Sequence, residues 1–166
     1  TYMGQSAMDF DEKIRITADE IQTAKTKKDF TNPIYLSVDE YGAFGSNFRS
    51  VLSVAQCLNS FVRHADVVKM ANFTMFTSLL GSDREKGTYK TPLFYIFKSF
   101  SNNCLGNSVD TYVACDTFNT ETYKGIPYLD VTSVYSPETQ TLYINVINRT
   151  KAKAITADEP TTPTEL

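Results

Sequence analysis

The stretch Ile34-Tyr35-Leu36-Ser37-Val38-Asp39-Glu40 indicates how this chain folds, and Tyr41-Gly42-Ala43-Phe44-Gly45 follows it directly. The stretch begins after Pro33, runs through β-branched, aromatic and other apolar residues, and ends on two carboxylates. This pattern is typical of a buried β-strand that carries an acidic side chain to a rim. In a parallel α/β barrel, catalytic side chains lie where strands end, so Glu40 is the candidate catalytic residue. The alternative is that Asp39 and Glu40 cap the next helix or form a surface ion pair.

The composition is that of an ordinary globular protein, with 166 residues, of which 42% are hydrophobic and 21% are charged. The net charge is −3, and the basic residues are dispersed apart from Lys25-Thr26-Lys27-Lys28, so we expect no nucleic-acid partner. No run of about 18 apolar residues is present, so we expect no membrane partner. The chain begins at Thr1 without an initiating methionine, which fits a piece of a longer protein.

The few cysteine and histidine residues argue against metal and disulfide chemistry. Cys57, Cys104 and Cys115 are widely spaced and form no C-x-x-C pair. The single histidine, His64, stands two residues before Asp66, a spacing that can ligate a metal but that lacks further ligands of the right types. A further alternative, an independent flavodoxin-like α/β domain, is disfavoured because no glycine-rich phosphate loop is present. We therefore expect neither a metal nor a cofactor.

The first part of the chain alternates between helical and strand patterns. A proline follows the first helix, Ser46 or Asn47 can cap the second, and Thr91-Pro92 starts the third. The elements expected here are a helix over 9–28, a strand over 34–40, a helix over 48–64, a strand buried on both faces over 66–76, a polar loop over 81–87 and a helix from residue 91. This order predicts parallel strands joined by helical crossovers.

The second part shows only alternation with a period of two residues. It predicts strands over 109–118, 129–135 and 142–148. The turn Ser136-Pro137-Glu138-Thr139 between the last two strands predicts an antiparallel hairpin. We therefore divide the chain into an α/β part, residues 1–102, and an all-β part, residues 103–166.

Several segments together resemble the C-terminal part of glycoside hydrolase family 51, the α-L-arabinofuranosidases. They occur in the family's order and spacing and include Thr91-Pro92 with the aromatic helix that follows. The other matching segments are Ser37-Val38-Asp39-Glu40-Tyr41, Leu58-Asn59-Ser60-Phe61-Val62-Arg63-His64-Ala65-Asp66, Val68-Lys69-Met70-Ala71-Asn72 and Ile126-Pro127-Tyr128-Leu129-Asp130-Val131.

The resemblance implies an α/β plus all-β fold: the C-terminal portion of a (β/α)8 TIM barrel, followed by part of a β-sandwich. It also implies a retaining, exo-acting enzyme that releases L-arabinose from arabinan or arabinoxylan side chains. Glu40 matches the family's nucleophile. The family's acid/base glutamate follows an asparagine, and this sequence contains no Asn-Glu pair. We therefore expect the isolated chain to be inactive and the complete polypeptide to be active.

The resemblance also suggests roles for other residues and for partners. Tyr41, which stands where the family usually has tryptophan, and Asn72, near the end of the second strand, are the candidate substrate-binding residues. Asp39, His64 and Asp66 are interpreted as structural support, although His64 and Asp66 recur in the family motif. The expected partner is an arabinose-containing oligosaccharide or polysaccharide, and the complete enzyme is expected to be a homo-oligomer. A bacterial setting, cytoplasmic or periplasmic/extracellular, is what the family suggests. The alternative is a non-catalytic sugar-binding or assembly module, if the chain is complete as given.

Overall fold

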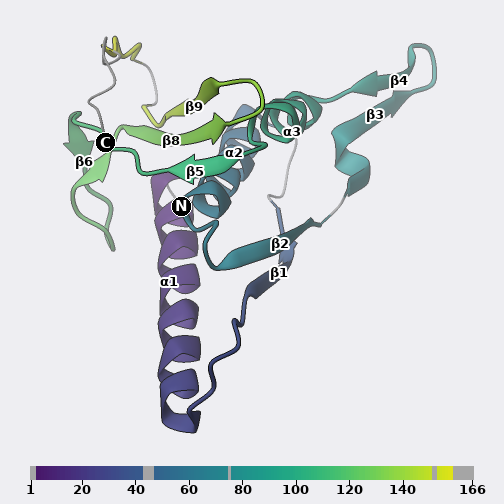
Figure 1. Cartoon of the computed structure of the whole chain (residues 1–166). Helices are drawn as coiled ribbons and strands as arrows, with labels where there is room; N and C mark the ends of the chain where they lie inside the picture. The colour runs from purple at the N-terminus through teal and green to yellow at the C-terminus, as the bar shows by residue number, and fades with distance from the viewer. Residues whose placement is uncertain (1–2, 43–46, 75, 151–152, 159–166) are drawn as a thin grey trace.

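The computed structural model describes residues 3–42, 47–74, 76–150 and 153–158. A long helix, α1, stands at one side of the molecule, and strands β5, β8 and β9 lie across its N-terminal end (Figure 1). The strand pair β1–β2 and the hairpin β3–β4 lie on the other side of helix α2. The fold is thus a small α/β unit beside an antiparallel sheet.

Helix α1 spans Met3–Lys28 and begins earlier than the sequence pattern predicts. It ends in a Schellman turn, because Asp29 has a φ of 51° and the Phe30 backbone N–H donates to the Lys25 carbonyl at 3.0 Å. Its first half is packed, with Ile14 buried, whereas Ile16 is 48% exposed. No helix among the described residues is both long and apolar enough to cross a membrane.

Strand β1 (Leu36–Tyr41), helix α2 (Phe48–Arg63) and strand β2 (Val68–Phe73) form a βαβ unit with parallel strands. The alternation read from the sequence is therefore confirmed here. Asn47 caps α2 by accepting the Ser50 backbone N–H at 3.0 Å, as expected, while Ser46 lies outside the described residues. The core of this unit consists of buried residues from β1, α2 and helix α3: Tyr41, Val51, Val54, Cys57 and Leu93.

The closed (β/α)8 barrel is not present in this chain, because β1 and β2 form a sheet of two strands within the described residues. The expected burial of both strands is also wrong. Met70 on β2 is 54% exposed, and Asp39 and Glu40 on β1 are exposed. One face of the pair packs on α2, and nothing in the described chain covers the other face.

The segment after β2 differs from the polar loop predicted over 81–87. A short 3-10 helix (Phe76–Leu79) leads into an antiparallel hairpin of β3 (Leu80–Asp83) and β4 (Gly87–Lys90). The turn forms because Asp83 Oδ1 accepts the backbone N–H groups of Glu85 and Lys86 at 2.9 and 2.8 Å. Helix α3 (Pro92–Asn103) then begins at the expected Pro92.

The antiparallel sheet has the order β5 (Asn107–Val109), β8 (Leu129–Ser136) and β9 (Thr141–Asn148). The β8–β9 hairpin is confirmed. The continuous strand predicted over 109–118 is wrong: residues 110–116 have no regular structure, and β6 (Thr117–Phe118) pairs with β7 (Ile126–Pro127) instead. Val113 and Cys115 are half-buried between exposed neighbours. Burial therefore alternates with a period of two residues, as in a strand, although the segment pairs with no other strand among the described residues.

Candidate active site

Glu40 and Asn72 lie at the same edge of the β1–β2 pair. Each stands one residue before the end of its strand. Because the two strands are parallel, their carboxyl ends meet at one edge, which is where ligands bind in parallel α/β sheets. The chain therefore presents a carboxylate and an amide from neighbouring strands at this edge.

A β-bulge at Asp39–Glu40 shapes this edge. Val38 is opposite Ala71 and Tyr41 is opposite Phe73, so three steps along β1 match two steps along β2. The extra residue breaks the alternation of side chains, and both Val38 and Tyr41 pack against the core cluster on the α2 side. Glu40, within the bulge, is exposed. Bulges of this kind re-aim a side chain and occur beside active sites.

Asn72 shares the uncovered face of the strand pair. Its neighbours Ala71 and Phe73 pack against the core, so alternation places Asn72 on the opposite face, and it is exposed. Ala71 and Phe73 are also the residues paired with Val38 and Tyr41, so Asn72 lies level with the bulge. The register therefore places Asn72 across from Asp39 and Glu40.

The structure places the Tyr41 ring in the core, away from this open face. Tyr41 is 8% exposed and makes edge contacts with Phe61 and Phe73, at centroid distances of 4.8 and 5.5 Å. Burial, with a smaller contribution from Cys57, raises the pKa of Tyr41 to about 12. The side chain holds the end of β1 against α2, directly beside Glu40.

The three residues expected to support the structure have different surroundings. Asp39 Oδ1 accepts the Ser37 hydroxyl at 2.7 Å, within β1. His64 links α2 to α1, since its Nε2 lies 3.1 Å from Asp11 Oδ1, and its backbone carbonyl accepts the Val68 N–H at 2.9 Å where β2 begins. Asp66 lies exposed in the turn between α2 and β2.

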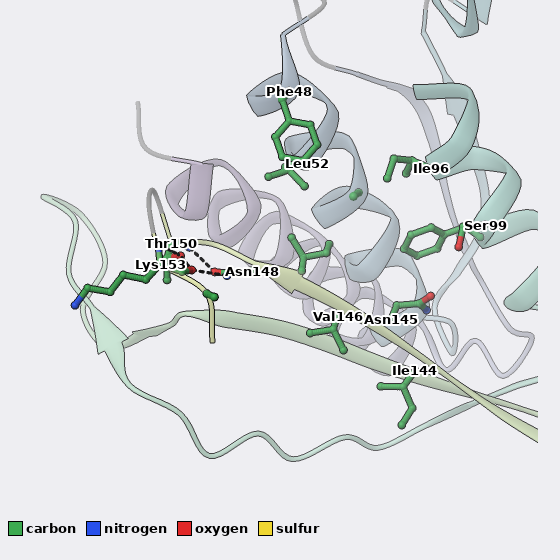
Figure 2. Close-up of a pocket in the computed structure, with 14 residues that line it drawn as sticks. Phe48, Leu52, Ile96, Ser99, Ile144, Asn145, Val146, Asn148, Thr150 and Lys153 are labelled. Carbon is green, nitrogen blue, oxygen red and sulfur yellow. Dashed lines mark hydrogen bonds between the residues drawn. The ribbon is translucent and has the colours of Figure 1, made fainter. Parts of the chain in front are cut away.

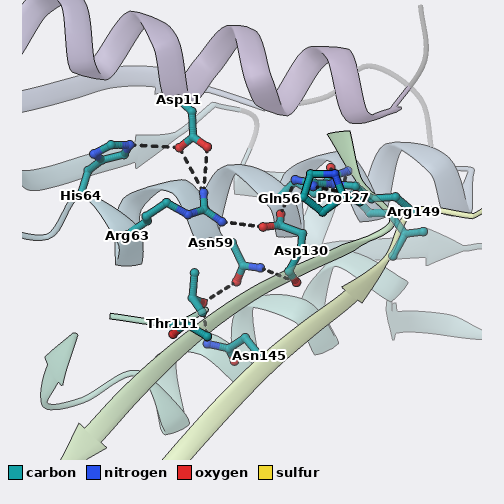
Figure 3. A network of polar contacts seen from close by, with 12 residues as sticks. Asp11, Gln56, Asn59, Arg63, His64, Thr111, Pro127, Asp130, Asn145 and Arg149 are labelled. Carbon is teal, nitrogen blue, oxygen red and sulfur yellow. Dashed lines mark hydrogen bonds and ion pairs between the residues drawn. The ribbon is translucent and has the colours of Figure 1, made fainter. Parts of the chain in front are cut away.

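A network of polar contacts joins α1 and α2 to the antiparallel sheet (Figure 3). Arg63, the last residue of α2, contacts Asp11 of α1 at 2.8 Å and Asp130 of β8 at 2.5 Å. Arg149 contacts the other Asp130 oxygen at 3.0 Å. Asp130 therefore receives two guanidinium groups from two separate parts of the chain.

Amides on α2 extend this network into the sheet. Gln56 Oε1 accepts from Arg149 Nε at 2.8 Å, and Asn59 donates to the Asp130 carbonyl at 3.3 Å. Thr132 donates its hydroxyl to Asn59 Oδ1 at 2.9 Å. Sequence reasoning missed this network. The sequence does contain a pattern that could have indicated the network. Gln56, Asn59 and Arg63 follow the spacing i, i+3, i+7, which places a polar stripe on an otherwise apolar helix.

Burial and charge act in opposite directions within the network. Burial alone would raise the pKa of Asp11, but the hydrogen bond with His64 and the charge of Arg63 outweigh it and lower that pKa. Burial lowers the pKa of Arg149, against the attraction of Asp130. For Arg63, burial is outweighed by Asp130 and Asp11, and its pKa is raised. These ion pairs therefore hold charged groups inside the fold.

A separate groove of about 660 Å³ lies between α2, α3 and β9 (Figure 2). Apolar side chains including Phe48, Leu52 and Ile96 line it. Its amides are engaged within the protein: Asn145 donates to Thr132 Oγ1 at 3.4 Å, and Asn148 donates to the Lys153 carbonyl at 2.9 Å. None of the residues at the Glu40 edge lines this groove, and we do not assign catalysis to it.

No three His, Cys, Asp or Glu side chains within the described ranges cluster so that they could hold a metal ion. At the Glu40 edge the chain offers a carboxylate and an amide. A carboxylate can act as a nucleophile or a proton carrier, and an amide can orient a hydroxyl group by hydrogen bonding.

The amino-acid sequence matches one protein family and several characterised relatives. The model of the alpha-L-arabinofuranosidase C-terminal domain matches residues 38–164. The intracellular exo-alpha-(1->5)-L-arabinofuranosidase 1 of Bacillus subtilis (strain 168) is 26% identical over 173 residues, covering 89% of this chain and 34% of that protein. The intracellular exo-alpha-(1->5)-L-arabinofuranosidase of Halalkalibacterium halodurans is 26% identical over 179 residues, covering 93% of this chain and 36% of that protein.

A solved structure shows the same fold. A family 51 alpha-L-arabinofuranosidase from Bifidobacterium longum matches with a TM-score of 0.78 at 17% identity, covering 89% of this chain and 35% of that one. The chain spans about a third of the length of the Bacillus subtilis and Halalkalibacterium halodurans relatives. These matches confirm the resemblance to the C-terminal part of family 51.

Proposed function

The chain belongs to the alpha-L-arabinofuranosidase C-terminal domain family, and on this premise we propose that it forms part of a retaining, exo-acting α-L-arabinofuranosidase. The observation that carries the proposal is the bulge that presents Glu40 on the open face of β1, level with Asn72 on β2. The two relatives act, by name, on α-(1->5)-linked L-arabinofuranosyl groups. The proposed substrate is an arabinose-containing oligosaccharide or polysaccharide such as arabinan or arabinoxylan.

In this proposal Glu40 is the nucleophile. Its carboxylate attacks the anomeric carbon and forms a glycosyl-enzyme, while a second carboxylic acid protonates the leaving oxygen. That second group then takes a proton from a water molecule, whose oxygen attacks the anomeric carbon and displaces the Glu40 carboxylate, so arabinose is released with its configuration retained. Retention requires the two carboxyl groups to lie about 5 to 5.5 Å apart. The second acid comes from a part of the polypeptide outside these 166 residues.

The other residues have positioning roles. Asn72 is proposed to donate a hydrogen bond to a sugar hydroxyl from the neighbouring strand. Tyr41, buried between Phe61 and Phe73, holds the strand end that carries Glu40. Asp39, His64 and Asp66 are proposed to support the structure of β1 and of the connection from α2 to β2.

The domain assignment belongs to the same proposal. Residues 1–102 form the end of a (β/α)8 barrel, from its sixth to its eighth helix, and residues 103–166 form part of a β-sandwich. The uncovered face and edges of the β1–β2 pair support the first assignment, since a parallel sheet is normally buried on both faces. The complete enzyme is proposed to be a homo-oligomer, and the isolated chain is expected to be inactive.

The test uses the complete polypeptide and an aryl α-L-arabinofuranoside. Glu40→Gln should lower kcat at least a thousandfold, because the glycosyl-enzyme cannot form, whereas the exposed control Glu138→Gln in the β8–β9 turn should leave it unchanged. Glu40→Ala with added azide should regain turnover and yield a β-arabinofuranosyl azide of inverted configuration. Full activity of Glu40→Gln would overturn the proposal.

A further inference from the structure

The β3–β4 hairpin rises from the same edge of the fold as Glu40. It is inserted between β2 and α3, after the carboxyl end of β2, and projects away from the body of the molecule (Figure 1). Every residue of β4 and most of β3 is exposed. In enzymes built on parallel strands, loops at this edge shape the substrate site.

Tyr89 lies over a glycine on this hairpin. It pairs with Gly81 across the two strands, and a Cβ atom placed on Gly81 would lie only 2.2 Å from Cζ of the Tyr89 ring. The ring therefore leans over the Gly81 backbone, where only glycine leaves room for it. Even so, Tyr89 is 51% exposed. The hairpin thus presents an aromatic ring to the solvent, above the backbone of Gly81.

The hairpin face around the Tyr89 ring is open and includes one carboxylate, that of Asp83. Alternation and pairing place Gly81, Asp83, Gly87 and Tyr89 on one face of the hairpin. A Cβ on Gly87 would meet nothing within 4 Å. Backbone hydrogen bonds from Lys86 and Glu85 lower the pKa of Asp83, which is therefore a charged acceptor.

Contacts at the base of the hairpin connect it to the rest of the fold. Thr91 Oγ1 donates to the Ser78 carbonyl at 2.8 Å, and the Thr91 N–H donates to the Leu79 carbonyl at 3.1 Å. Lys90 Nζ lies 4.8 Å from the centre of the Phe94 ring. These contacts stabilise an element that a two-strand ladder alone supports only weakly.

We propose that Tyr89 is a stacking platform for a sugar ring of the glycan, at a subsite beyond the arabinose that is released. The polarised C–H groups of a sugar face the electron-rich ring, and a carboxylate beside it accepts hydroxyl hydrogen bonds. One ring flanked by glycines is far smaller than a stable protein interface, which needs about 800 Å² from each partner. The inference rests on the proposed function, since it assigns a substrate-binding residue to that enzyme.

The test compares two substrates in the complete enzyme. An aryl arabinofuranoside occupies only the cleavage position, whereas a linear α-1,5-arabino-oligosaccharide also reaches the outer subsite. Tyr89→Ala should raise KM for the oligosaccharide about three- to tenfold and leave kcat and KM for the aryl substrate unchanged. Tyr89→Phe should behave as the wild type, because it keeps the ring. Tyr95→Ala, which removes another exposed tyrosine (59% exposed), is the matched control and should leave KM and kcat unchanged for both substrates.

Two further measurements separate this inference from the proposed function. Gly81→Ala should reproduce the oligosaccharide effect, because the added methyl group displaces the ring. Titration of arabinotetraose into the Glu40→Gln enzyme should shift the Tyr89 ring resonances in a saturable way. An equal loss on both substrates, wild-type KM in Tyr89→Ala, or absence of the shift would overturn the inference. Full activity of Glu40→Gln overturns only the proposed function.

Discussion

Asp130 and Arg149 form an ion pair that is almost completely buried, with 3.0 Å between Oδ2 and Nη2 and side-chain exposures of 1% and 4%. Asp130 lies on β8, whereas Arg149 follows β9, and Arg63 reaches the other Asp130 oxygen from the end of α2. A buried charge is tolerated only when it is paired and hydrogen-bonded. This carboxylate therefore fastens the helices to the antiparallel sheet.

Asp130→Asn should strongly destabilise the protein. Asparagine keeps the size of the side chain but removes the negative charge that faces both Arg63 and Arg149. Removing one partner of a buried ion pair costs about 3 to 5 kcal/mol. Urea denaturation of the full-length protein measures the loss. Asp110→Asn, at an exposed position, is the control, and a similar midpoint for the two variants would contradict the network's role.

The stabilising effect of Asp11 should disappear in acid. The pKa of Asp11 is lowered in the folded state, so the folded protein favours the ionised carboxylate. Its contribution is fully present above the unfolded-state pKa, about 3.9, and is lost as the pH falls through the folded-state pKa. The difference in unfolding free energy between wild type and Asp11→Asn should therefore shrink from pH 5 downward. A constant difference over that range would refute this linkage.

Tyr41→Phe should make the protein less sensitive to alkali. Burial raises the pKa of Tyr41 to about 12, so the folded state keeps the phenol protonated after the unfolded state has begun to ionise, near pH 10. Stability is then complete below pH 10 and falls as the pH rises toward 12. Unfolding free energies measured at pH 8 and pH 11 should differ less in Tyr41→Phe than in wild type. Tyr112→Phe, at a residue that is 92% exposed, should keep the wild-type dependence.

Asp29→Gly should stabilise the protein by about 1 kcal/mol, because glycine adopts a positive φ without a Cβ clash. Asp29 has a φ of 51° at the end of α1, where its charge also faces the negative end of the helix dipole. Asp29→Ala removes the charge but keeps the clash, so the Gly variant should melt at a higher temperature than the Ala variant. Equal melting temperatures would show that backbone strain is absent.

Local sequence patterns were sufficient to predict an element when its formation depends on residues within or next to it. The cap at Asn47, the start of α3 at Pro92 and the β8–β9 hairpin were all predicted, because capping side chains and a turn-forming proline act within a few residues. The hairpin β3–β4 was missed because the run over 81–87 is polar and shows no apolar alternation, although Asp83, whose side chain accepts the backbone N–H groups of the turn, is a local turn signal. The strand over 110–116 was overpredicted because burial alternates there without pairing.

The sequence by itself determined the order α1, β1, α2, β2, the start of α3, the β8–β9 hairpin, and the position of Glu40 near the end of a strand. These follow from the periodicity of apolar residues and from neighbouring caps and breakers, which are local, whereas the family was suggested by the resemblance of several collinear segments. Only the tertiary structure decided that β1 carries a bulge at Asp39–Glu40, since a bulge is defined by the register with β2. The same holds for Asp130, whose partner Arg63 is 67 residues away. Such pairings depend on which surfaces the packed helices and strands bring together, and no single stretch of sequence contains that information.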